Sequence, residues 1–76
     1  MKIEIDLNKL LLEANEEIEL LPYFVKLELT EKGIPIKIDP TNIRDPDFVI
    51  ERGFMDYKIN VDNMVMEINY YEQHAA

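Results

Sequence analysis

The stretch from Phe54 to Tyr71 constrains the fold more than any other part of the chain, because it reads as one β-hairpin. Its two halves, FMDYKINV and MVMEINYY, flank Asp62-Asn63, and both of these residue types tolerate the positive φ of a two-residue turn. The apolar face then carries Met55, Tyr57, Ile59, Val61, Met64, Met66, Ile68 and Tyr70. The other face pairs Asn60 with Val65, Lys58 with Glu67, Asp56 with Asn69 and Phe54 with Tyr71. A shift by one residue would scatter the apolar set over both faces, so this register is strongly specified.

In the N-terminal part, the spacing of the apolar residues changes from every second residue to every third or fourth residue. Residues 2–7 alternate between charged and apolar side chains, which predicts a half-buried strand. We predict a helix over residues 9–20, with Asn8 as its N-cap. Pro22 is expected to end this helix, because the residue before a proline is driven out of the α region. The apolar stripe of the predicted helix consists of Leu7, Leu10, Leu11, Ala14, Ile18 and Leu21.

In the middle of the chain, apolar and polar residues alternate again. Residues 23–29 and 34–39 predict a second hairpin, joined by a four-residue loop that ends at Gly33. Pro35 has no amide proton, so its strand should lie at a sheet edge. Residues 39–47 hold two prolines and three aspartates, which is typical of turns.

Together these elements predict one small α+β domain over residues 1–76. The apolar run of residues 48–50 fits either a brief strand or a plug over the sheet. The expected order is strand, helix, strand, strand, loop, strand, strand, with one helix packed on an antiparallel or mixed sheet. A chain of 76 residues has room for a single small core.

The apolar face of the C-terminal hairpin is larger than one helix of about twelve residues can cover. Three arrangements would cover the rest: the sheet curls toward a half-barrel, the loop over residues 40–53 folds across it, or a second molecule packs on it. The last of these predicts a homodimer or a binding surface. On the opposite face, Phe54 and Tyr71 form a directly paired aromatic couple, joined there by Phe24 and Val65. This couple is a candidate contact patch for a protein partner, unless the loop covers it.

The net charge of the chain limits the classes of partner that it is expected to bind. The chain has 16 acidic and 8 basic residues, for a net charge of −8, which opposes direct binding to nucleic acid or anionic lipid. This charge fits simple solubility or a basic protein partner. No apolar run approaches the roughly 18 residues of a membrane span, and no signal-peptide pattern opens the chain, so we expect a cytoplasmic protein. Abundant residues with AT-rich codons suggest a low-GC bacterium or its phage as the source.

Residues that commonly carry out catalysis are scarce. The chain has no Ser and no Cys, so the usual activated nucleophiles are missing. His74 is the only histidine and lies in residues 73–76, a tail expected to fray, where no partner would fix it. Asp39, Asp45 and Asp47 do not follow calcium-loop spacing, and turn capping explains them better. We therefore expect no enzyme, no cofactor and no metal site.

Glu13, Glu16 and Glu17 are neighbours on one face of the predicted helix and, with Asp6, form an acidic strip. Such a strip suits an Arg- or Lys-lined groove, although a solvated helix face is the simpler explanation. We predict a non-enzymatic protein-interaction module. Its most specific form is a phage or mobile-element inhibitor that occupies the basic groove of a host nucleic-acid enzyme. The alternative is a structural or assembly subunit that forms a homo-oligomer through the C-terminal hairpin.

Overall fold

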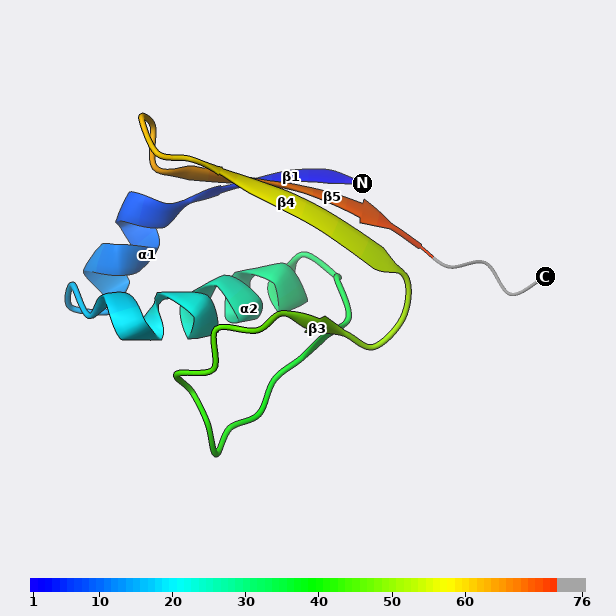
Figure 1. Cartoon of the computed structure of the whole chain (residues 1–76), viewed down its shortest axis with the longest axis horizontal. Helices are drawn as coiled ribbons and strands as arrows, with labels where there is room; N and C mark the ends of the chain where they lie inside the picture. The colour runs from blue at the N-terminus through cyan, green and yellow to red at the C-terminus, as the bar shows by residue number, and fades with distance from the viewer. Residues whose placement is uncertain (73–76) are drawn as a thin grey trace.

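The computed structural model describes residues 1–72, and it confirms the α+β class. A three-stranded antiparallel sheet lies over two helices, and a long loop with a small two-stranded sheet lies beyond the second helix (Figure 1). In chain order the elements are β1 (Lys2–Asp6), α1 (Leu7–Glu13), the 3-10 helix η1 (Ile18–Leu20), α2 (Leu21–Glu31), β2 (Ile36–Lys37), β3 (Val49–Ile50), β4 (Phe54–Asn60) and β5 (Val65–Tyr71). The tail expected to fray and its His74 lie outside the described residues.

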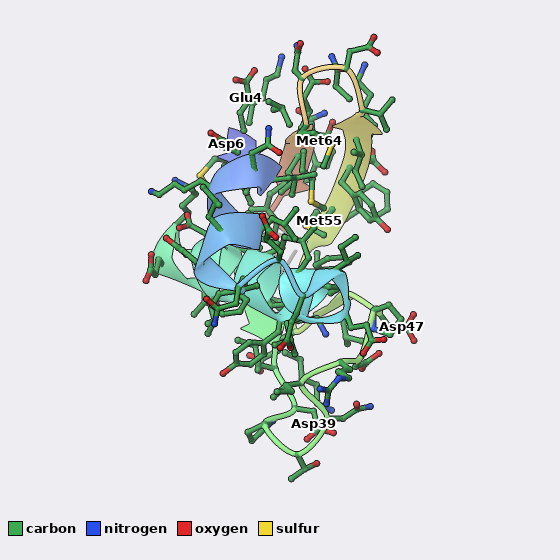
Figure 2. All side chains as sticks on the ribbon, turned by 90° about the vertical axis from the view of Figure 1, so that its left-hand side faces the viewer. Glu4, Asp6, Asp39, Asp47, Met55 and Met64 are labelled. Atoms are coloured by element: carbon green, nitrogen blue, oxygen red, sulfur yellow. The ribbon has the colours of Figure 1, made fainter. Side chains whose placement is uncertain are left out.

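The register predicted for the C-terminal hairpin is confirmed. β4 and β5 pair antiparallel from Phe54 opposite Tyr71 to Asn60 opposite Val65. β1 adds to the other side of β5, so the strand order is β1-β5-β4. Within residues 1–72 the two outer strands do not pair with each other, so this sheet is open and does not close into a barrel. Met55 and Met64 lie on the side of the hairpin that faces α1 (Figure 2).

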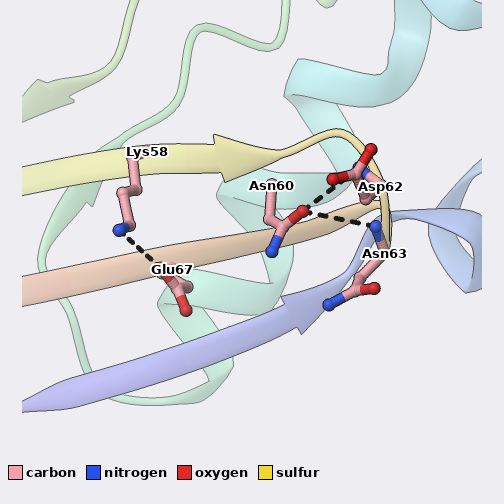
Figure 3. Close-up of polar contacts among 5 residues, drawn as sticks. All are labelled: Lys58, Asn60, Asp62, Asn63 and Glu67. Carbon is pink, nitrogen blue, oxygen red and sulfur yellow. Dashed lines mark hydrogen bonds and ion pairs between the residues drawn. The ribbon is translucent and has the colours of Figure 1, made fainter.

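The turn of this hairpin differs from the prediction. It takes four residues, 61–64, and the positive φ falls on Met64 at 51° and not on Asp62 or Asn63. The Oδ1 atom of Asn60 accepts hydrogen bonds from the amides of Asp62 at 3.1 Å and Asn63 at 3.4 Å (Figure 3). This side-chain cap closes the wider turn without changing the strand register.

The single helix predicted over residues 9–20 is wrong, because the chain leaves the helix after Glu13. Asn15 and Glu16 have φ of 55° and 62°, and the amide of Glu16 donates to the carbonyl of Leu11 at 2.8 Å. This pattern is a Schellman ending with Asn15 in the left-handed position, the residue type that replaces glycine there most readily. Asp6, and not Asn8, is the N-cap of α1.

The strand predicted over residues 23–29 is also wrong, since this segment is the body of α2. Pro22 lies in the first turn of α2, where its missing amide proton costs no hydrogen bond. Gly33, with φ of 91°, ends the helix: its amide donates to Thr30 at 3.1 Å, and the next amide donates to Leu29 at 3.0 Å. The glycine assigned to a hairpin loop is thus a helix terminator, and the second hairpin does not exist.

What remains of the second hairpin is the short strand β2. It pairs with β3, Ile36 opposite Ile50, so the brief-strand interpretation of residues 48–50 is confirmed. The core lies between the helices and the inner face of β1 and β5. Its buried members are Ile3, Ile5, Leu7, Leu10, Val25, Leu29, Ile34, Ile36, Met66, Ile68 and Tyr70.

Candidate functional site

Strand β4 and the turn that follows it carry a row of apolar side chains that the helices do not cover. Tyr57 and Ile59 of the strand and Val61 of the turn, here called the β4 strip, are 50, 51 and 73% exposed. Tyr57 and Ile59 lie on the face on which Ile68 and Met66 of the neighbouring strand are buried to 0 and 2% exposure. The apolar face therefore extends beyond its cover at the terminal strand of the sheet, as the sequence indicated.

Part of that face is covered by the loop over residues 40–53. The ring of Phe48 meets the ring of Tyr57 edge-on, with centroids 5.4 Å apart and an interplanar angle of 61°. Phe48 and Ile50 are partly buried against the core. The predicted loop cover is thus present, but it leaves Ile59 and Val61 more than half exposed.

Lys26 holds this loop in place. It is only 4% exposed, and its Nζ donates to the backbone carbonyl of Asp45 at 2.8 Å. The same ammonium lies 5.8 Å from the centroid of the Phe48 ring, within range of a cation–π interaction. A strand over residues 23–29 would place Lys26 on its exposed face, whereas α2 turns the side chain inward. No local sequence signal marks this contact.

Phe54 and Tyr71, the predicted aromatic couple, are brought together on the opposite face of the hairpin. Their rings stack with centroids 5.9 Å apart and an interplanar angle of 29°, and the side chains are 59 and 52% exposed. The loop does not cover them. Phe24 is not part of this patch, because it lies on α2 and packs against the core.

The acidic strip does not form as predicted. Glu13, Glu16 and Glu17 are all exposed, but α1 ends at Glu13 and the next two glutamates lie outside any helix. Glu16 has the left-handed backbone described above, and Glu17 has extended dihedrals of −82° and 96°. Asp6 caps the opposite end of α1, so the four carboxylates do not share one helix face.

Asp39 and Asp45 of the long loop cap turns, as expected. Asp39 Oδ1 accepts hydrogen bonds from the hydroxyl of Thr41 at 2.6 Å and from its amide at 2.9 Å. These two bonds, the hydroxyl bond foremost, lower the pKa of Asp39 below its ordinary value. Asp45 accepts a hydrogen bond from the amide of Asp47 at 3.0 Å in the same way.

In residues 1–72, no three His, Asp or Glu side chains are grouped so that they could hold a metal ion. None of the helices in that part of the chain has the length and apolar character needed to cross a bilayer.

Comparison with protein-family models, with characterised proteins and with solved structures gave no match. The candidate site is therefore defined by geometry alone: the β4 strip and the Phe54–Tyr71 couple on one hairpin.

Proposed function

We propose that the protein is a small, acidic, non-enzymatic protein-interaction module that binds through the β4–β5 hairpin. The exposure of the β4 strip supports this proposal: Ile59 is 51% exposed, whereas its cross-strand neighbour Met66 is 2% exposed. Covering this surface would contribute about 25 cal/mol for each Å² of apolar area removed from water. A row of exposed apolar side chains on a terminal strand is a candidate contact surface for another protein.

The Phe54–Tyr71 couple and the net charge add to the proposal. Tyrosine is enriched among residues that dominate binding energy, and stacked rings hold each other in place before the partner arrives. A net charge of −8 favours a basic partner. The inhibitor of a nucleic-acid enzyme is the most specific form of this proposal. It rests on charge and size, and it predicts binding that weakens steeply as salt rises.

Site-specific crosslinking tests the proposal. A photoreactive phenylalanine analogue at Ile59 should give a discrete adduct in a bacterial lysate, whereas the same analogue at Val49 should not. Val49 is a matched control, since it is 48% exposed and apolar but lies in β3. Excess wild-type protein should suppress the adduct, and excess Tyr57→Thr/Ile59→Thr protein should not. Equal labelling from both positions, or suppression by both competitors, would contradict binding through the strip.

A second candidate is a structural subunit that self-associates through the hairpin. It is favoured by the position of β4, a seven-residue strand at the end of the sheet order. If the aromatic face forms that interface, replacing Phe54 and Tyr71 by Ser should dissociate the oligomer. An unchanged solution mass would reject that face.

A further inference from the structure

We infer that the free edge of β4 pairs with β4 of a second copy of the chain. The two strands run antiparallel, related by a two-fold axis at Tyr57. The inference rests on the second candidate of the proposed function, self-association through the hairpin, because it names the segment that pairs there. β4 is the last strand of its sheet, so one edge of its backbone pairs with no other strand in the described part of the chain. Proteins usually protect such an edge with proline, a bulge, a charge such as lysine, or a very short strand. β4 has seven residues and no proline, its one lysine, Lys58, is paired with Glu67 within the chain, and Met55, Tyr57 and Ile59 lie on its inner side.

The charges of β4 select one register. A symmetric antiparallel pair repeats every cross-strand contact twice, because the same patch meets itself. With the axis at Tyr57, Asp56 of each copy lies opposite Lys58 of the other. The same register sets Met55 opposite Ile59 and brings the two Tyr57 rings side by side. Opposite charges and apolar side chains are both favourable cross-strand neighbours.

The neighbouring registers each bring like charges together. With the axis at Asp56 or Lys58, that residue meets its own copy. With the axis at Ile59, Asp56 lies opposite Asp62, and with the axis at Met55, Lys58 lies opposite Arg52. Like charges directly opposite each other destabilise a strand pair. Among the centres at residues 55–59, which keep most of β4 paired, Tyr57 is therefore the one that brings no like charges together.

The pairing would extend an arrangement already present within the chain. Lys58 lies 3.4 Å from Glu67 on β5 (Figure 3), so the second copy's Asp56 would complete a row of alternating charges across three strands. The result is a continuous six-stranded sheet in the order β1-β5-β4-β4-β5-β1. On its inner side, contacts between Met55 and Ile59 cover the middle of the β4 strip.

A charge-reversal experiment tests the register. Sedimentation equilibrium of the wild-type protein should give twice the 9.0 kDa of one chain. Asp56→Lys, and Lys58→Asp combined with Glu67→Lys, should each raise the dissociation constant on the order of tenfold or more, since each turns two opposite-charge contacts between the copies into like-charge contacts. Mixing these two variants should restore the dimer, because their charges complement each other. The double variant Asp56→Lys/Lys58→Asp should also dimerise.

Folding effects are controlled within the hairpin. Every variant with Lys58→Asp also carries Glu67→Lys, so that the ion pair between β4 and β5 keeps its strength with reversed sign. Circular dichroism then checks that each variant is folded. A wild-type monomer, single variants that stay dimeric, or a mixture that stays monomeric would each overturn the inference. If the wild type is monomeric but Ile59 still gives the competitor-sensitive adduct with another protein, self-pairing fails and the proposed function stands. If that adduct is missing as well, both fail.

Discussion

The ammonium group of Lys26 donates a hydrogen bond to the backbone carbonyl of Asp45 at 2.8 Å, across 19 residues of sequence. This contact ties α2 to the long loop, and through Phe48 it sets how much of β4 the loop covers. The extent of the candidate contact surface therefore depends on one buried lysine.

Lys26→Met should loosen the loop while keeping most of the packing, because methionine fills the space of the lysine stem but offers no donor. The free energy of unfolding should fall by about 1–2 kcal/mol, the usual cost of leaving a partly buried carbonyl without its partner. Hydrogen exchange of the amides in residues 45–48 should accelerate. Lys32→Met is the control, since Lys32 makes only an exposed ion pair with Glu28 at 4.0 Å. Equal effects of the two replacements would contradict the anchoring role of Lys26.

The two glycines separate backbone strain from steric contact. Both have positive φ, 91° at Gly33 and 87° at Gly53. An added Cβ at Gly33 meets nothing within 4 Å, whereas one at Gly53 would lie 2.6 Å from the carbonyl oxygen of Tyr71. Gly33→Ala should therefore cost about 1–2 kcal/mol from the backbone alone. Gly53→Ala should cost clearly more in urea unfolding, and a smaller cost at Gly53 would refute the close approach.

Asp39 makes the stability of the folded protein depend on pH. Its pKa is lowered in the folded protein, foremost by the Thr41 hydroxyl. A lowered pKa means that the carboxylate contributes stability above the pKa of the unfolded chain, and that this contribution is lost as the pH falls through the folded pKa. Thr41→Val should raise the Asp39 pKa toward its ordinary value of 3.8, as followed by NMR of the carboxyl carbon. An unchanged titration would exclude the hydroxyl as the cause.

The hairpin could be predicted from the sequence because its information is local. A period of two on both strands leaves one register that keeps the apolar side chains on one face, and that register also fixes the Phe54–Tyr71 couple. The turn could not be placed to the residue, since Asn60 caps it from within the strand.

The middle of the chain was predicted wrongly because its apolar residues fit two periods. Val25, Leu27 and Leu29 alternate, but Leu21, Val25 and Leu29 also recur every four residues. Two signals would have favoured the helix: a proline in the first turn, and Gly33 four residues beyond the last buried position. Asn15 is the corresponding signal for the end of α1.

The exposure of the β4 strip depends on tertiary structure. Pattern alone assigns Ile59 and Ile68 to the same face, yet one is 51% exposed and the other is fully buried. The difference arises because Ile68 lies on the middle strand of the sheet and belongs to the buried core, whereas Ile59 lies on an outer strand. The Lys26–Asp45 contact could not be predicted from the sequence pattern either, because it forms only when residues 21–31 are helical.

Leu27 and Leu29 provide the sharpest test of α2. A strand over residues 23–29 would place both side chains on one face and make them equivalent, whereas the helix buries Leu29 to 0% exposure and leaves Leu27 only partly buried. Leu29→Ala should therefore cost about 3–5 kcal/mol of unfolding free energy, the range for a leucine removed from a closed core. Leu27→Ala should cost about half of that or less, because part of its apolar area is already in water. Both are measured by urea unfolding. Equal losses would mean that the segment does not pack as a helix, and the anchoring of the loop by Lys26 would fall with it.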